Sequence, residues 1–190
     1  MNKKRLAILA SGSGTNAEAI MKYFENSDLI EVALVLSNKS DAYVLTRAEK
    51  FNVKSKFFDR RELYDSTSIL DLLESNDIDY IILAGFLWLI PKNLIAAYKD
   101  RIINIHPALL PNYGGKGMYG DKVHQAVIAN DEKQSGITIH LVDEIYDNGR
   151  ILNQKTVEIK SSDTPEILAS KIHELEHQFF PSTIEEYIVA

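Results

Sequence analysis

Segments of strand length alternate with segments of helical spacing through the first half of this chain. The strand-length segments lie at Leu6–Ala10, Ile30–Leu36, Val53–Phe58, Tyr80–Ala84 and Arg101–Ile105. Helical patterns fill the intervals, at Thr15–Met21, Asp41–Phe51, Glu62–Ser75 and Pro91–Tyr98. This alternation is typical of βαβ units with right-handed crossovers. We therefore expect an α/β fold: a Rossmann-like, open, mainly parallel and twisted sheet with helices on both of its faces.

The pattern changes after residue 106. A long loop from Pro107 to Gly120 contains four glycines and two prolines, and a helical pattern follows at Lys122–Asn130. The segments Gly136–Val142 and Ile151–Ile159 alternate as strands do, and few residues separate them. Because short connections favour antiparallel neighbours, we expect an antiparallel edge of the sheet in the C-terminal part.

The last part of the chain predicts one long helix. Asp163-Thr164-Pro165-Glu166 combines a capping residue, a proline in the first turn and an early acid. The helix should run to Phe180, where Pro181 kinks or ends it. The length favours a single domain over residues 1–190, in which 1–105 form a phosphate-binding βα half and 106–190 carry the catalytic loop, the late strands and the C-terminal helix.

Composition excludes several classes of function. The chain has 27 acidic residues against 21 Lys and Arg and a formal charge of -6, which opposes general nucleic-acid binding. It has no cysteine, so disulfides, thiolate metal sites and cysteine nucleophiles are excluded, and a reducing compartment such as the cytoplasm is favoured. No apolar run approaches the roughly 20 residues of a membrane span, so we expect no membrane partner.

A glycine-rich loop follows the first predicted strand and opens a helix. Its sequence, Gly12-Ser13-Gly14-Thr15-Asn16-Ala17, places backbone N–H groups and hydroxyl and amide donors before a helix N-terminus, which favours an anion. It formally fits a dinucleotide fingerprint, but the second strand ends in Ser37-Asn38-Lys39 without the acid that binds a ribose hydroxyl. We expect Gly14, Thr15 and Asn16 to bind a phosphate monoester; a purely structural tight turn is the alternative.

A helical segment near the end resembles a zinc-protease motif. His173-Glu174-Leu175-Glu176-His177 places two histidines four residues apart on one helical face. Catalytic zinc needs a third protein ligand, and only thirteen residues follow this motif. We expect no metal site here; the alternative is a helix face that borders a pocket or only forms hydrogen bonds.

Polar side chains gather where the fifth strand ends. Asn104 and His106 are two residues apart, so they face the same side of the strand. Ligands of open α/β sheets bind beyond the carboxyl ends of the strands, so both side chains are catalytic candidates. Asp147 lies in the acidic turn 143–147, for which a solvated turn is the simpler interpretation, and His140 on the preceding strand has an equally plausible structural role.

The assembled motifs resemble the glycinamide ribonucleotide formyltransferase family of folate-dependent enzymes. The resemblance covers nearly the whole chain and is carried by SGSGTN, SNKSDA, LAGFLWLI, NIHPALLP, SGITIHLVDE and HELEH. It implies formyl transfer from 10-formyltetrahydrofolate to a ribonucleotide amine in purine biosynthesis, with small-molecule partners, no metal, and a monomer or weak homodimer. The HELEH helix then contacts substrate and binds no zinc.

Residue by residue, the resemblance implies three sets of site residues. The catalytic residues are Asn104, His106 and Asp147, with Asp147 raising the pKa of His106 to keep the imidazole charged. The ribonucleotide contacts Gly14, Thr15, Asn16, His173 and Glu176. The folate contacts are Arg61, Leu87, Trp88, Leu89, Ile90, Asn104, Asp143 and Asp147.

Some features depart from the family or leave rivals open. Asp147-Asn148-Gly149-Arg150 stands where members often have Asp-Gly-Gly-Pro, and the segment 112–120 is longer and richer in glycine than in many members. Trp88 replaces a polar or basic residue of other members and is interpreted as part of a wall.

Rival functions are the formyltransferase of initiator methionyl-tRNA and formyltetrahydrofolate hydrolase, both of which carry an extra domain, and a non-catalytic nucleotide-binding module.

Overall fold

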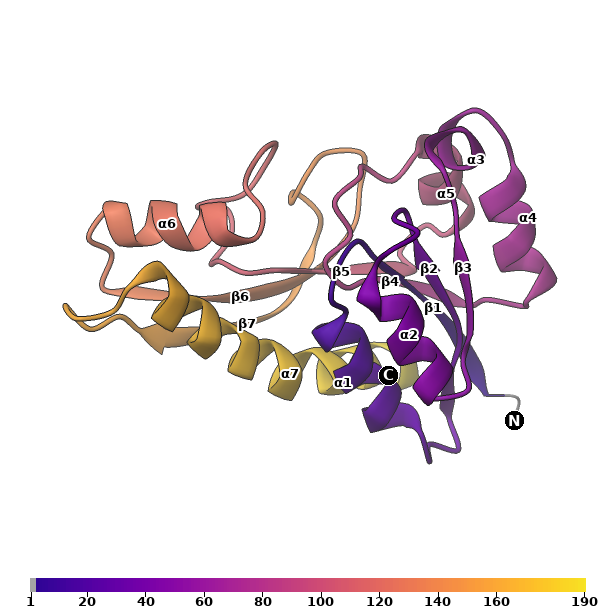
Figure 1. Ribbon diagram of the computed structural model, residues 1–190, viewed down its shortest axis with the longest axis horizontal. Helices are drawn as coiled ribbons and strands as arrows, with labels where there is room; N and C mark the ends of the chain where they lie inside the picture. The colour runs from indigo at the N-terminus through magenta and orange to yellow at the C-terminus, as the bar shows by residue number, and fades with distance from the viewer. Residues whose placement is uncertain (1–2) are drawn as a thin grey trace.

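A seven-stranded sheet forms the centre of the molecule, in a computed structural model that describes residues 3–190 (Figure 1). The strand order is β3-β2-β1-β4-β5-β6-β7. The parallel strands are β1 (Lys4–Ala10), β2 (Ile30–Ser37), β3 (Lys54–Phe57), β4 (Tyr80–Leu83) and β5 (Ile102–His106). The antiparallel additions are β6 (Gln134–Leu141) and β7 (Ile151–Glu158). The expected mainly parallel sheet with an antiparallel C-terminal edge is confirmed.

Helices cover both faces of this sheet. They are α1 (Thr15–Phe24), α2 (Tyr43–Lys50), α3 (Arg60–Tyr64), α4 (Ser68–Ser75), α5 (Lys92–Ala97), α6 (Asp121–Ala129) and α7 (Pro165–Val189). Successive residues of β1 point to opposite faces, so Leu6 and Ile8 join one core with α1, α2, α6 and α7, whereas Ala7 and Leu9 join a second core with α3, α4 and α5. The carboxyl ends of the parallel strands are therefore held between two packed layers.

The segment predicted as one helix at 62–75 forms two helices, α3 and α4. The side chain of Asp59 accepts the N–H of Glu62 and the Glu62 carboxylate accepts the N–H of Asp59, so α3 begins earlier than expected. The hydroxyl of Ser66 donates to the Glu62 carbonyl and accepts the Ser68 N–H. These local hydrogen bonds of a short polar side chain compete with the helix and separate the two pieces.

The expected end of the last helix at Phe180 is wrong. Helix α7 continues through Pro181 to Val189. Pro181 is buried together with Phe180 and Ile184, and α7 packs on α1, α6, β6 and β7. This packing outweighs the hydrogen bond that a proline cannot donate.

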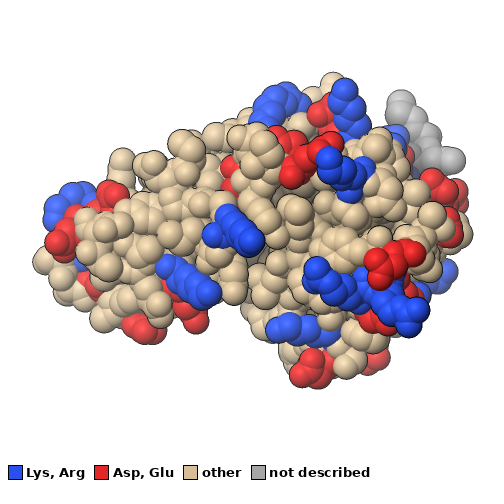
Figure 2. All heavy atoms as spheres, turned by 90° about the horizontal axis from the view of Figure 1, so that it is seen from above, with Lys and Arg blue, Asp and Glu red and all other residues tan. Residues whose placement is uncertain are grey.

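Charge is dispersed over the surface. On the face seen in Figure 2, basic and acidic side chains are interspersed and no large block of one sign stands out. Within residues 3–190, no helix is both long enough and apolar enough to cross a membrane. Residues 1 and 2, which the predicted single domain includes, lie outside the described part of the chain.

Candidate functional site

A cleft of about 550 Å³ lies at the carboxyl ends of β1, β4 and β5. Its walls come from the β1–α1 loop, the segment after β4, the end of β5, the loop before α6, the β6–β7 connection and one face of α7. This is the position at which open parallel sheets bind ligands. The cleft thus joins segments that are as far apart in the chain as residues 12 and 176.

The glycine loop is pressed against α2 at one end of the cleft. Gly14 has a φ of 76°, and a Cβ atom there would lie 2.4 Å from Cγ2 of Val44. The N–H of Val44 donates to the Gly12 carbonyl over 3.2 Å, and Nε of Arg47 donates to the Ser13 carbonyl over 2.8 Å. Helix α2 thus holds the loop through its carbonyl groups. The first N–H groups of α1 lack partners within the helix, as at any helix N-terminus, and such groups favour an anion.

Asn16 connects this loop to α7. Its Nδ2 donates to Oε2 of Glu176 over 2.9 Å, and Nδ1 of His173 lies 2.9 Å from the same oxygen. The hydrogen bond with Glu176 raises the pKa of His173, although burial opposes the rise. The Oδ1 atom of Asn16 is buried and has no partner among the described residues. The loop and α7 therefore form a polar part of the cleft, beside a histidine whose pKa is raised.

The HELEH segment, which resembles a zinc site, forms hydrogen bonds and ring contacts on α7. His173 bonds to Glu176, and the ring of His177 stacks on that of His173 at 6.3 Å. Within residues 3–190, no three His, Asp or Glu side chains are grouped as metal ligands. Both His173 and Glu176 line the cleft, in its polar part.

Asn104 and His140 face each other across the β5–β6 pair. Nδ2 of Asn104 lies 3.1 Å from Nε2 of His140, and Nδ1 of His140 lies 2.8 Å from the Leu141 carbonyl. A carbonyl oxygen only accepts, so Nδ1 of His140 carries the proton and Nε2 accepts from Asn104. This arrangement fixes the orientation of the Asn104 amide and leaves its second N–H for the cleft.

His106 and Asp147 lie next to each other in the lining of the cleft. Nε2 of His106 donates to the Tyr113 carbonyl over 2.8 Å, and Nδ1 lies 3.5 Å from Oδ2 of Asp147. The same carboxylate oxygen accepts the Gly115 N–H over 2.9 Å. Nδ1 is therefore the only nitrogen of His106 that is available for chemistry.

Burial and charge act in opposite directions on this pair. Burial lowers the pKa of His106 below its ordinary value, and the nearby Asp147 carboxylate offsets only part of this. Burial alone would raise the pKa of Asp147, but the side chains of His140 and His106 and the Gly115 N–H together lower it. Asp147 is thus an anion that raises the pKa of His106, as expected, but burial of the imidazole outweighs this effect.

The cleft also has an apolar wall. This wall includes Leu83 and the segment 85–90, whose start is fixed because Ser11 donates its N–H to the Gly85 carbonyl and accepts the Leu87 N–H at Oγ. Trp88 packs edge-on against Phe58 at 6.2 Å. This aromatic packing agrees with the interpretation of Trp88 as part of a wall.

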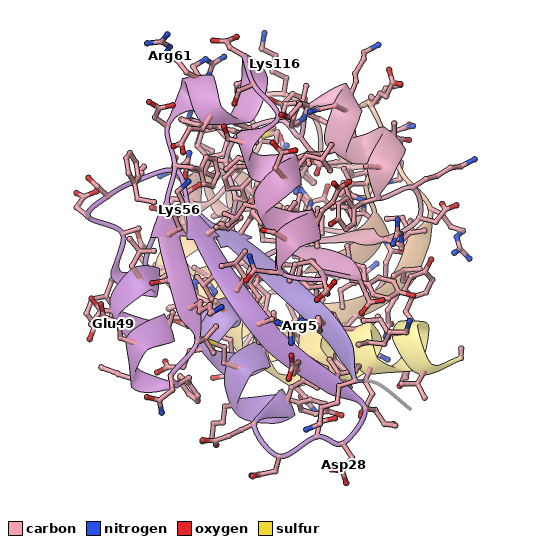
Figure 3. All side chains as sticks on the ribbon, turned by 90° about the vertical axis from the view of Figure 1, so that its right-hand side faces the viewer. Arg5, Asp28, Glu49, Lys56, Arg61 and Lys116 are labelled. Carbon is pink, nitrogen blue, oxygen red and sulfur yellow. The ribbon has the colours of Figure 1, made fainter. Side chains whose placement is uncertain are left out.

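The predicted site residues are brought together in this cleft, apart from one. Its lining includes Gly14, Thr15, Asn16, Leu87, Trp88, Leu89, Ile90, Asn104, His106, Asp143, Asp147, His173 and Glu176. Arg61 is not part of the lining and points away from the body of the molecule in Figure 3. Its neighbour Arg60 instead places its guanidinium over the rings of Tyr64 at 4.7 Å and Trp88 at 5.6 Å.

Sequence reasoning missed His124 and Tyr113. His124 is buried on α6 and lines the cleft; its Nδ1 has no partner among the described residues, and burial lowers its pKa. The only sequence feature that could have indicated His124 is its place on the inward face of a predicted helix. No sequence pattern indicates that the Tyr113 carbonyl bonds to His106, because that contact depends on the path of an irregular loop.

The fold and cleft define an α/β protein whose cleft, at the carboxyl ends of the parallel strands, combines a glycine loop, an apolar wall, and a carboxylate, an imidazole and an amide. Residues 4–184 match the family described as formyl transferase, and the chain belongs to that family.

Several relatives share most of this chain. It is 40% identical over 190 residues to phosphoribosylglycinamide formyltransferase, chloroplastic, from Vigna unguiculata, with 97% of this chain and 61% of the relative covered. The Bacillus subtilis (strain 168) phosphoribosylglycinamide formyltransferase is 38% identical, with 97% and 95% covered. The crystal structure of the Bacillus halodurans protein of that name has a TM-score of 0.87 at 38% identity, with 96% and 94% covered. The chain thus spans less than two thirds of the plant relative.

Proposed function

We propose that this protein transfers a formyl group from 10-formyltetrahydrofolate to the primary amine of glycinamide ribonucleotide, a step of purine biosynthesis. The observation that carries the proposal is the convergence of Asn104, His106 and Asp147 in one cleft with the glycine loop. Relatives of 38% to 40% identity that are named phosphoribosylglycinamide formyltransferase support the same reaction. We also propose a monomer or weak homodimer that acts in the cytoplasm on small molecules.

The ribonucleotide phosphate is assigned to the β1–α1 loop. N–H groups at the start of α1 and the donors of Thr15 and Asn16 suit a phosphate dianion. His173, whose pKa is raised by its hydrogen bond with Glu176, favours the same anion when it is protonated. Glu176 remains an acceptor for ribose hydroxyls, since a carboxylate has more lone pairs than its two present partners use. Anchoring the phosphate here holds the amine near His106 and makes the encounter effectively unimolecular.

The apolar wall suits the ring system of a reduced folate. A volume of about 550 Å³ is within the range of roughly 300–1,000 Å³ found for small-molecule sites. The 85–90 segment and the exposed Ile145 and Tyr146 of the β6–β7 connection offer apolar surface to a flat ring. The buried Nδ1 of His124 and Oδ1 of Asn16 provide polar groups that still lack partners.

The reaction proceeds by direct attack. The amine nitrogen forms a bond to the formyl carbon, and the formyl oxygen takes up negative charge in the tetrahedral intermediate. A proton on Nδ1 of His106 and the free N–H of Asn104 stabilise this oxyanion. The separation of 3.5 Å between Nδ1 and Asp147 exceeds a good hydrogen bond, so the proton can be shared with the oxyanion. The bond from carbon to the folate nitrogen then breaks, and the amine proton moves to that nitrogen through a water ordered by Asp147.

The charge on His106 arises when the ligands bind. In the ligand-free protein burial holds the pKa of His106 low. A phosphate dianion and the carboxylates of a folate bring negative charge into the cleft and favour the imidazolium, in the same direction as Asp147. In this view the first half, residues 1–105, anchors the phosphate, and residues 106–190 supply the catalytic groups.

A transfer assay with a labelled formyl group tests the proposal. Isotope-labelled 10-formyltetrahydrofolate is offered with glycinamide ribonucleotide, with initiator methionyl-tRNA or with water alone. We expect label on the ribonucleotide only, and none when His106→Ala replaces the wild type. Label on the tRNA, free formate in every arm, or no consumption of the folate would each refute the assignment.

A further inference from the structure

Tyr113 has a backbone conformation that is unusual for a large side chain. Its φ is 56°, in the left-handed region that favours glycine, although two glycines follow it directly. In this conformation its carbonyl accepts the hydrogen bond from Nε2 of His106 over 2.8 Å. Strain of this kind persists only where surrounding contacts hold it in place. Other contacts must therefore hold Tyr113 in this conformation.

The phenol of Tyr113 supplies those contacts. Its hydroxyl donates to Oε1 of Glu132 over 2.7 Å and accepts from Nδ2 of Asn130 over 3.0 Å. Asn130 directly follows the end of α6 and Glu132 lies two residues further on, and neither lines the cleft. The ring also packs against the larger hydrophobic core. One residue thus has its carbonyl in the catalytic centre and its hydroxyl anchored on a helix end outside it.

We propose that Tyr113 is a positioning residue that sets the tautomer of His106. Its carbonyl lies 2.8 Å from Nε2, whereas Asp147 lies 3.5 Å from Nδ1, so the neutral ring avoids the closer clash of lone pairs by carrying its proton on Nε2. The neutral imidazole then presents its unprotonated Nδ1 to Asp147 and the substrates, and the catalytic proton is gained and lost at that atom only. The anchor formed by Glu132 and Asn130 keeps the strained carbonyl in place. The catalytic part of this inference depends on the proposed formyl transfer, whereas the tautomer does not.

The geometry of the neighbouring loop explains why this anchor matters. After Tyr113 the chain continues as Gly114-Gly115-Lys116-Gly117, which has little side-chain packing of its own. The Gly115 N–H bonds to Asp147, so the loop also reaches the second member of the catalytic pair. The two hydroxyl bonds of Tyr113 tie the beginning of this loop to α6. Loss of the anchor lets the left-handed residue relax and turns its carbonyl away from His106.

Nitrogen-15 NMR of the histidine rings in the full chain tests the tautomer directly. Spectra are recorded above the pKa of His106, and the resonances are assigned by their loss in His106→Asn. We expect a proton on Nε2 of His106 in the wild type and a substantial population with the proton on Nδ1 in Tyr113→Phe. In the transfer assay, Tyr113→Phe should lower kcat roughly tenfold, as for a lost hydrogen bond to a carboxylate, with the ribonucleotide KM within about twofold.

Matched variants separate positioning from general damage. Glu132→Gln keeps an acceptor oxygen and should resemble the wild type, whereas Glu132→Ala should reproduce Tyr113→Phe. Tyr23→Phe is the control, because it removes a comparable hydrogen bond, 2.6 Å to Glu185, outside the cleft. An unchanged tautomer in both Tyr113→Phe and Glu132→Ala overturns the proposal. If the tautomer shifts as expected but the wild type transfers no formyl group, the proposed function fails and the positioning role stands.

Discussion

The amide of Asn104 donates a hydrogen bond to Nε2 of His140, 3.1 Å away on the adjacent antiparallel strand. His140 accepts because its Nδ1 proton is already engaged by the Leu141 carbonyl. The contact turns the NH₂ group of Asn104, not its oxygen, toward the catalytic centre. A buried histidine on β6 thereby decides which end of the amide meets the substrate.

Asn104→Asp should therefore abolish most of the turnover. The substitution keeps the shape of the side chain but replaces two donors by a carboxylate, which repels a developing oxyanion. We expect kcat to fall by about 100-fold or more, as when one oxyanion donor is lost. Asn93→Asp adds the same charge at an exposed position of α5 outside the cleft and serves as the control. A normal kcat for Asn104→Asp in a protein with unchanged circular dichroism would contradict the oxyanion role.

The approximate strand ends and the shared face of Asn104 and His106 could be predicted from the sequence, because apolar runs and the period-2 alternation of strands are local patterns. The tautomers could not be predicted, since they depend on carbonyl groups of Tyr113 and Leu141 that any residue type would offer. Helix α7 passed its expected end because tertiary packing of Phe180 and Ile184 overrode a local signal. Arg61 was expected at the folate end from a resemblance, but the side chain that lies over Trp88 is that of Arg60.

Asp147→Asn should shift the pH profile of the enzyme to lower pH. Removing the carboxylate removes an interaction that raises the pKa of His106, while the burial that lowers it remains. The imidazolium then exists only at lower pH, so kcat/KM begins its fall on the alkaline side at a lower pH. The pH dependence of kcat/KM is measured for both proteins. An alkaline limb at the same pH in Asp147→Asn would show that the Asp147–His106 pair does not control this step.

Buried neutral histidines should make the protein less stable in acid. The pKa values of His106 and His124 are lowered by burial from an ordinary value of 6.5, so the unfolded chain binds more protons between the folded pKa and 6.5. The stability that these neutral histidines contribute is fully present above pH 6.5 and is lost as the pH falls through their pKa in the folded protein. His173 has the opposite sign, because its pKa is raised and its contribution is lost as the pH rises.

Urea unfolding of His124→Gln and His173→Gln at about pH 7.5 and about pH 5 measures how each histidine changes the pH dependence of the unfolding free energy. The decrease in unfolding free energy toward pH 5 should become smaller in His124→Gln and larger in His173→Gln. Equal decreases in both variants and the wild type would mean that neither histidine changes its pKa on folding.

Binding of the folate should depend on Trp88 more than on Arg61. Trp88 lines the cleft and packs on Phe58, whereas Arg61 is exposed and outside the lining. Trp88→Ala should raise the KM for the folate severalfold and leave the ribonucleotide KM nearly unchanged. Arg61→Ala tests whether the folate contact that the resemblance implies is made after all. A larger rise of the folate KM in Arg61→Ala than in Trp88→Ala would show that the bound folate extends beyond the cleft to α3.

Gly14→Ala should weaken both the fold and the binding of the ribonucleotide. The new Cβ would lie 2.4 Å from Cγ2 of Val44, at a φ of 76° that alanine rarely adopts. The left-handed conformation costs about 1–2 kcal/mol, and overpacking adds about 1–3 kcal/mol. Gly12→Ala is the matched control, since a Cβ there meets nothing within 4 Å.

The double variant Gly14→Ala with Val44→Ala tests how much of the loss comes from the Val44 side chain. It removes Cγ2 of Val44 but keeps the Cβ and Cα atoms of residue 44, at 2.5 Å and 2.9 Å from the new Cβ, and the strained φ, so it should recover only a small part of the stability lost in Gly14→Ala. Binding of a phosphate-bearing ligand is measured by calorimetry beside binding of the folate. Loss of both ligands to the same degree in Gly14→Ala would indicate that the loop acts only as a structural turn, whereas selective loss of the phosphate ligand places the anion at the start of α1.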